Sequence, residues 1–119
     1  MLIRKDQLEV FENYARAELE RRIFAHVSKF FPKEISELGT DTARRLVHDG
    51  IRYAQAFRFV SEGNICKYVD LLVVLGSDFA TRFGWARNVL AEVNSSDPDD
   101  MMSRLLLAAD EELRGNNHE

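Results

Sequence analysis

Hydrophobic residues recur at helical spacing along almost the whole chain. Within residues 5–31 each apolar residue follows the last by three or four positions, which is the spacing of one face of an amphipathic helix. These apolar positions are Leu8, Phe11, Ala15, Leu19, Ile23, Val27 and Phe30. We therefore expect a long first helix with a single apolar face, ended by Pro32 because proline lacks a backbone N–H donor.

The next stretch predicts two more helices separated by a turn. Residues 33–38 form a short helical pattern that Gly39 closes. Residues 41–57 follow, with two apolar stripes that place Gly50 between them. The stripes are Leu46/Tyr53/Phe57 and Val47/Ile51/Ala54. Glycine costs about 1 kcal/mol in a helix interior relative to alanine, so Gly50 either marks a close helix crossing or is simply tolerated.

Residues 62–75 carry the clearest helix signals in the chain. Ser61 is the expected N-cap, Val60 and Ile65 form an expected hydrophobic staple, and Gly76 ends the helix. The run from Val69 to Leu75 is apolar on almost every side, as in a buried helix. Its β-branched residues make a strand the competing prediction, and we prefer a helix because no second run of this type exists to pair with it.

The last third of the chain predicts two further helices. One spans residues 84–93, and the other begins where Asp97 caps and Pro98 takes the first helical position. Gly115 ends it, and residues 116–119 are expected to fray. The predicted fold class is all-α, with residues 1–119 forming a single compact bundle of five to six helices. The long N-terminal helix lies outside, the apolar helices near 41–57 and 62–75 are central, and the expected radius of gyration is about 13–14 Å.

Charge is distributed unevenly along the 119 residues, whose net charge is −4. Residues 1–60 hold 11 Lys/Arg and 9 Asp/Glu, whereas residues 61–119 hold 5 and 11. An acidic second half argues against nucleic acid as a partner, because nucleic-acid binders concentrate basic residues. Arg44 and Arg45 begin a helix after a short helix and a turn, which imitates a helix-turn-helix, but that helix is apolar on two sides.

Signals for export and for membrane insertion are missing from the sequence. The first three residues, Met1-Leu2-Ile3, run straight into the charged stretch 4–6, without an apolar signal region after it. The longest apolar runs have five residues, against about 20 needed to span a bilayer. The lone Cys66 suits a reducing compartment. We therefore expect a cytoplasmic protein that does not contact a membrane.

Candidate chemistry is sparse. Cys66 lies on the buried helix without an evident base, which predicts a core residue rather than a nucleophile. Asp97, Asp99 and Asp100 fit helix capping better than a calcium loop. The histidines are far apart in sequence, at positions 26, 48 and 118. We therefore expect no catalytic residues, no metal site and no cofactor, and the chain is predicted not to be an enzyme.

Asp70 interrupts the apolar run of its helix. A buried carboxylate is costly unless it is paired or hydrogen-bonded. Two structural interpretations stay open for it. Asp70 lies on an exposed strip with Lys67, or it braces a neighbouring helix terminus or an arginine. The candidate arginines are Arg45, Arg52 and Arg58.

Five large aromatic residues surround the two connections that flank residues 62–75. They are Phe57, Phe59, Phe79, Phe83 and Trp85, and most are expected in the core. Because aromatic side chains dominate the energetics of interfaces, one or two exposed rings would anchor a partner. Our hypothesis places Phe79, Phe83 and Trp85 at a partner-binding surface.

Three segments carry recognisable motifs: Gly50–Ala54, Phe59–Glu62 and Tyr68–Phe79. Together they resemble a group of small bacterial helical proteins encoded beside type VI secretion effectors and spike-tip proteins. They match that family's Gly-Ile pattern, its aromatic-Val-Asp-Leu helix and its Leu-Gly-x-Asp-Phe ending. Trp85-Ala86 resembles the family's Pro-Trp-Ala segment, with Gly84 in place of proline. The resemblance covers the layout of residues 8–113.

The resemblance implies a cytoplasmic accessory protein. The leading hypothesis is a non-catalytic adaptor or co-chaperone-like helper that binds a type VI secretion effector, a larger adaptor or a spike-tip protein. The first alternative is an immunity protein that inhibits a cognate toxin, and the second is a helix-turn-helix-like transcription regulator. A homodimer is also compatible with the sequence, because small helical bundles often bury surplus apolar surface by two-fold pairing.

Overall fold

Every regular element in the computed structural model is a helix, as the sequence predicts. The structure describes residues 4–115, and within them there is no strand. The helices are α1 (Lys5–Phe30), α2 (Pro32–Leu38), α3 (Thr40–Ala56), α4 (Glu62–Leu75), α5 (Phe79–Arg82), α6 (Gly84–Leu90) and α7 (Pro98–Gly115). The predicted fold class is confirmed. The described residues form seven helices, because the connection after α4 contains the short α5.

The helix ends follow from capping groups. The Ser61 hydroxyl accepts a hydrogen bond from the Asn64 backbone N–H at 3.1 Å, as expected of an N-cap. Asp97 accepts one from the Asp100 N–H at 3.2 Å at the start of α7. Gly76 ends α4 with φ of 108°, a left-handed conformation that glycine adopts without steric cost. The expected staple at Val60 does not form, because that side chain is 79% exposed.

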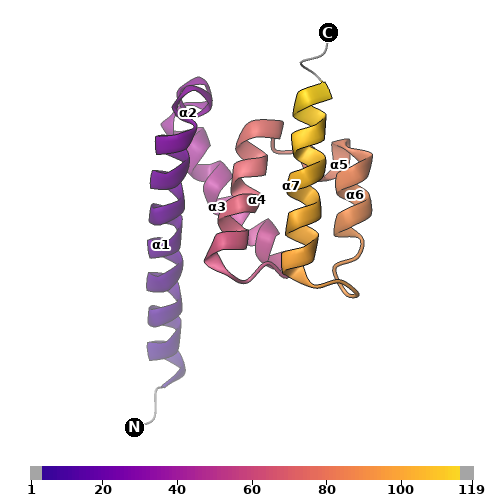
Figure 1. The fold of residues 1–119 in the computed structure, drawn as a ribbon. Helices are drawn as coiled ribbons and strands as arrows, with labels where there is room; N and C mark the ends of the chain where they lie inside the picture. Colours follow the sequence, from indigo (N-terminus) through magenta and orange to yellow (C-terminus); the bar gives the residue numbers. More distant parts are fainter. Residues whose placement is uncertain (1–3, 116–119) are drawn as a thin grey trace.

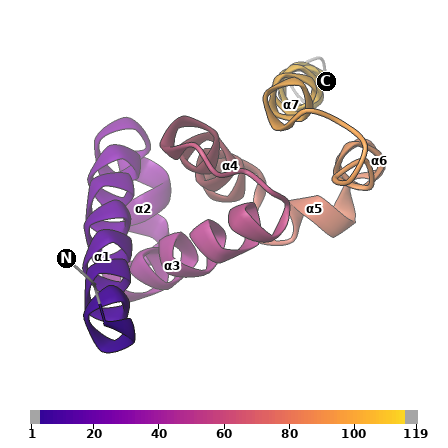
Figure 2. The ribbon, with the colours of Figure 1, turned by 90° about the horizontal axis from the view of Figure 1, so that it is seen from below.

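Helix α4 lies at the centre of the fold. It contacts every other helix except α6, and its closest partner is α3. Figure 2 shows α1, α2 and α3 on one side of α4, with α5, α6 and α7 on the other. The core that joins the two sides includes the large buried side chains of Ile23, Ile51, Phe59, Tyr68, Phe79, Met101 and Leu105. The central placement predicted for α3 and α4 is confirmed.

The α3–α4 crossing explains Gly50. A Cβ atom at this position would lie 2.7 Å from Leu72 Cδ1 and 3.2 Å from Val69 Cγ2. These distances are shorter than ordinary van der Waals contact, so a side chain at Gly50 would force the packed side chains of Leu72 and Val69 to shift. The interpretation of Gly50 as a close-crossing residue is the correct one.

The shape of the molecule differs from the expectation. The radius of gyration is 15.8 Å, larger than predicted, and the principal extents are 61 × 37 × 19 Å. Figure 1 shows the reason: the N-terminal half of α1 projects beyond the other helices. Residues 5–17 of this helix are all exposed. The expected tail at 116–119 lies outside the described residues.

Candidate functional site

The three aromatic residues of the partner-binding hypothesis belong to one ring cluster. Phe79 has no exposed surface, and its ring lies 5.3 Å from that of Tyr68 and 6.5 Å from that of Trp85. As a correction to the hypothesis, Phe79 is a core residue in this conformation and offers nothing to a partner.

Phe83 and Trp85 are only partly buried. Their rings stack with centroids 5.3 Å apart, and the indole N–H of Trp85 donates to Glu112 Oε1 of α7 at 3.2 Å. The Arg82 guanidinium lies 4.6 Å from the centre of the Phe83 ring. These contacts hold α6 against α7, so both rings stabilise the fold of the free chain. Their role toward a partner stays a prediction.

Asp70 pairs with a residue that the sequence interpretation did not name. Its two carboxylate oxygens lie 3.0 and 3.2 Å from Nε2 of His26 on α1. It therefore braces the neighbouring helix α1 through the His26 side chain, a partner that neither interpretation named, rather than through an arginine, a helix terminus or Lys67. Burial raises the pKa of Asp70, and the hydrogen bond from His26 opposes that rise.

Cys66 lies one helical turn before Asp70 and completes a small cluster with His26. One ligand-type atom from each of the three side chains lies within 4.8 Å of the other two. Burial, with a further contribution from the charge of Asp70, raises the pKa of the Cys66 thiol to about 11. A thiol that stays protonated at neutral pH is a weak nucleophile, because nucleophilic attack requires the thiolate.

A groove of about 700 Å³ opens between α2, α3 and the C-terminal end of α4. We call it the α2–α4 groove. Its apolar lining comes from Leu38, Leu46, Tyr53, Leu72, Val73, Val74 and Leu75. Its polar lining comes from Glu34, Glu37, Thr42, Arg45, Asp49 and Ser77. The volume is within the range of about 300–1,000 Å³ typical of ligand-binding clefts.

The close α3–α4 crossing shapes this groove. Gly50 brings the two helices together, and α2 folds back over the start of α3, so the groove runs beside the crossing. Tyr53 and Leu38 expose apolar surface at its edge. Three carboxylates and one guanidinium line it, which gives the groove a negative balance. An apolar floor with a polar rim is the usual anatomy of a protein-binding surface.

The sequence held a signal for the groove that our interpretation did not use. Residues 41–57 carry two apolar stripes, and the structure places them differently. Val47, Ile51 and Ala54 are buried in the core, whereas Leu46 and Tyr53 line the groove. A helix that is apolar on two sides has one side more than a single core contact requires, and here the second side faces the groove.

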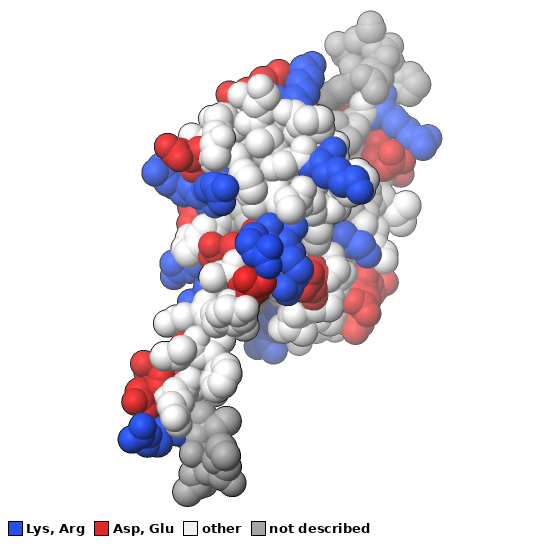
Figure 3. All heavy atoms as spheres, turned by 90° about the vertical axis from the view of Figure 1, so that its left-hand side faces the viewer, with Lys and Arg blue, Asp and Glu red and all other residues white. Residues whose placement is uncertain are grey.

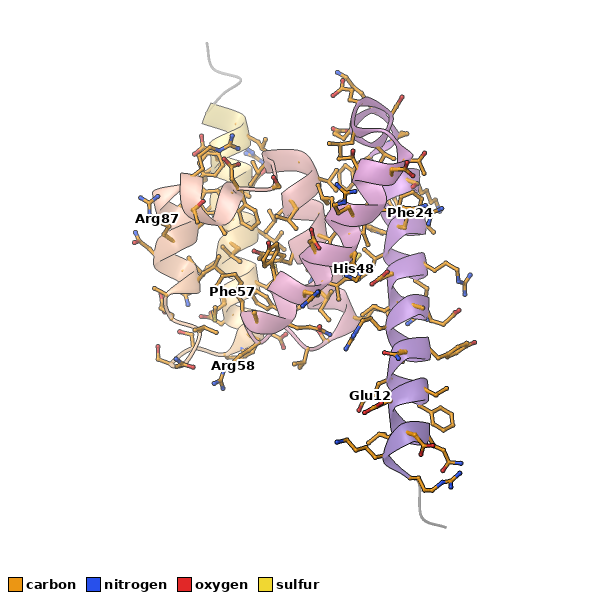
Figure 4. All side chains as sticks on the ribbon, turned by 180° about the vertical axis from the view of Figure 1, so that it is seen from behind. Glu12, Phe24, His48, Phe57, Arg58 and Arg87 are labelled. Carbon is orange, nitrogen blue, oxygen red and sulfur yellow. The ribbon has the colours of Figure 1, made fainter. Side chains whose placement is uncertain are left out.

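One arginine of the helix-turn-helix interpretation contacts another helix, and the other lines the groove. The Arg44 guanidinium lies 4.3 Å from the centre of the Phe24 ring of α1. Arg45 lines the groove beside its carboxylates. Figure 4 shows Phe24 and His48 at the side where α1 and α3 meet. His48 contacts Glu20 of α1 at 2.5 Å. This side of α3 is therefore occupied by α1, which leaves no free recognition face on that side.

Comparisons with known proteins do not assign the chain to a family. No protein-family model matches the chain, and neither the curated sequences nor the solved structures include a significantly similar protein. Within residues 4–115 no helix is both long and apolar enough to cross a membrane.

Proposed function

We propose that the chain is a non-catalytic protein-binding accessory factor, an adaptor or co-chaperone-like helper for a type VI secretion effector. The observation that supports a binding role is the α2–α4 groove, with its apolar floor and acidic rim. The type VI context rests on the resemblance of the stretches within Gly50–Phe79 to accessory proteins of that system. A cytoplasmic location belongs to the same proposal.

The chemistry of the groove specifies the segment it would hold. An amphipathic helix places an apolar stripe on the groove floor and leaves its flanks at the rim, a common mode of peptide recognition. Lysine or arginine on those flanks would face Glu34, Glu37 and Asp49. We therefore propose that the partner contributes a basic amphipathic helix. The exposed ring of Tyr53 is the expected anchor, because tyrosine is enriched among residues that dominate binding energy.

Affinity capture from the native organism tests this proposal when matched variants are compared. Wild-type protein, Tyr53→Glu and the control Val60→Glu are used as baits, and captured proteins are identified by mass spectrometry. Both variants add one negative charge at an exposed position, but Val60 lies outside the groove. We expect an effector or spike-associated protein with wild type and Val60→Glu, and its loss by at least tenfold with Tyr53→Glu. Equal capture by all three baits would contradict the groove as the binding site.

An immunity role is the second candidate, and the acidic groove rim favours it for a basic toxin. Complementary charge speeds association and makes the rate fall steeply with salt. Deletion of the gene separates the two candidates. Loss of effector delivery without self-poisoning supports the adaptor, whereas growth arrest caused by sibling cells supports the immunity protein.

A further inference from the structure

Three side chains with metal-binding chemistry meet where α1 packs against α4. His26 comes from α1, and Cys66 and Asp70 come from α4, where their i,i+4 spacing places them on one face of the helix. One nitrogen, one sulfur and one oxygen atom from these side chains lie within 4.8 Å of one another. The sequence expectation of no metal site depended on spacing along the chain, whereas the fold brings together His26 and Asp70, which are 44 residues apart.

The spacing of these ligand atoms fits a tetrahedral zinc ion. Zinc binds histidine nitrogen and carboxylate oxygen at about 2.0–2.2 Å and thiolate sulfur at about 2.3 Å. Around one tetrahedral ion, such bonds separate nitrogen from oxygen by roughly 3.3 Å and nitrogen from sulfur by roughly 3.6 Å. His26 Nε2 already lies 3.0 and 3.2 Å from the two carboxylate oxygens of Asp70. Cys66 Sγ therefore needs to approach by no more than about 1.2 Å to complete the ligand set.

The charges of the three side chains balance a divalent cation. One thiolate and one carboxylate neutralise Zn²⁺, and a neutral histidine adds no charge. This balance matters because the side chains of His26 and Asp70 are only 32% and 25% exposed, and burial of an unbalanced charge is costly. One helical turn away, Arg22 is compensated by Glu62 at 2.8 Å. On the face of the molecule shown in Figure 3, basic side chains likewise lie next to acidic ones.

A bound cation opposes the effect of burial on Cys66. Burial raises the pKa of this thiol to about 11, and the charges of Asp70 and Glu62 raise it further in the same direction. A metal ion stabilises the thiolate and displaces the thiol proton, so a high pKa lowers the affinity of a site without blocking it. The two carboxylates that disfavour the thiolate also attract a cation. Binding of a metal ion therefore releases the Cys66 proton.

The mixed ligand set selects the kind of ion. Magnesium and calcium take oxygen ligands, whereas a thiolate with an imidazole favours zinc and other transition metals. All three side chains are only partly buried, so solvent can reach the site and supply a fourth ligand. The Phe30 ring lies 4.9 Å from the ring of His26 and limits how that imidazole can turn. The arrangement therefore suits a zinc ion with three protein ligands and one water molecule.

We propose that His26, Cys66 and Asp70 bind Zn²⁺, with water as the fourth ligand. The ion would take the place of the hydrogen bond between His26 and Asp70 and would join α1 to α4. Its expected effect is to hold the first helix against the central helix. Because α1 lines no part of the α2–α4 groove, the inference does not depend on the proposed function.

Cobalt titration of the untagged full chain, stripped of metal and kept reduced, tests the proposal. The chain has one cysteine, so a sulfur-to-cobalt charge-transfer band can arise only from Cys66. We expect this band, with the strong visible absorption of tetrahedral Co²⁺, to saturate at one ion per chain. Added Zn²⁺ should remove both signals by displacing the cobalt.

Matched variants assign the ligands. Cys66→Ser should abolish the charge-transfer band, and His26→Gln and Asp70→Asn should each weaken binding by about tenfold or more. The control His48→Gln removes a different contact between a histidine and a carboxylate, the one with Glu20 of α1. It should leave the affinity unchanged. Circular dichroism of each variant checks that the helices remain folded.

A second measurement needs no substitution of the ligands. Long-range ¹H–¹⁵N NMR spectra of the imidazole rings report which ring nitrogen binds Zn²⁺. We expect a large shift of Nε2 of His26, with both ring nitrogens of His48 unmoved. At a hundredfold excess over the dissociation constant, Zn²⁺ should also raise the melting temperature of the wild-type chain by about 10 °C, and that of Cys66→Ser much less.

Three results would overturn the proposal. One is the absence of a sulfur-to-cobalt band at about 1 mM Co²⁺, a concentration that reveals even weak binding. Another is saturation at half an ion per chain, which indicates an ion held by the thiols of two chains. The third is an affinity that His26→Gln leaves unchanged while the variant stays folded.

Discussion

Individual polar side chains fix how α1 lies against α4. Arg22 bonds Glu62 at 2.8 Å, and one turn later His26 bonds Asp70 at 3.0 Å. The sequence identified Asp70 as a carboxylate that needed a partner, but it could not identify His26, which lies 44 residues earlier. Helical periodicity gives the face on which a residue lies, whereas the rotation of one helix against another depends on packing of the whole core.

Removal of the Asp70 carboxylate should weaken the contact between α1 and α4. We expect Asp70→Ala to lower the free energy of unfolding by about 1–3 kcal/mol, the usual cost of losing a hydrogen bond that involves a charged group. Urea denaturation measures this, and a double-mutant cycle with His26→Ala isolates the pair. The control Asp110→Ala breaks an exposed i,i+4 ion pair and should change stability by less than about 0.5 kcal/mol. Equal effects of the two variants would show that Asp70 is not a brace.

Among the elements, both ends of α4 and the start of α7 were predictable, whereas the end of α6, at Leu90 rather than residue 93, and the faces of α1 were not. Ser61, Gly76 and Asp97 act locally, through hydrogen bonds and backbone angles within one turn, so the sequence alone placed the boundaries of α4 and the start of α7. The residues from Phe11 to Val27 were interpreted as a single inward face. Four steps of four residues rotate the stripe by about 160°, because each step exceeds a full turn by about 40°. Phe11 therefore faces outward, whereas Val27 faces the core.

The α3–α4 crossing gives a prediction with a built-in control. We expect Gly50→Ala to destabilise the fold by about 1–3 kcal/mol, because the added methyl group overpacks the contact with Leu72 and Val69. Gly63 also lies inside a helix, but a Cβ there meets nothing within 4 Å. Gly63→Ala should therefore stabilise the protein by up to about 1 kcal/mol through helix propensity. Thermal unfolding of both variants measures whether each substitution lowers or raises stability. A stabilising Gly50→Ala would contradict the close crossing.

The whole molecule consists of a central body and a long first helix whose N-terminal half projects from it. The all-α class and the central place of α3 and α4 followed from periodicity, because burial on most sides requires neighbours on most sides. The projection of α1 did not follow, since periodicity says nothing about whether a helix ends level with its neighbours. The body holds the α2–α4 groove, and the N-terminal half of α1 projects beyond it.

The most direct test of the protein-binding claim is a map of the bound surface. Two-dimensional ¹H–¹⁵N NMR spectra of labelled protein, recorded with and without the captured partner or its basic helix, report every backbone amide. Our account predicts the largest shift changes at α2, around Leu46 and Tyr53 of α3, and at the C-terminal end of α4. Changes confined to α6 and α7, with the groove amides unmoved at saturation, would contradict it.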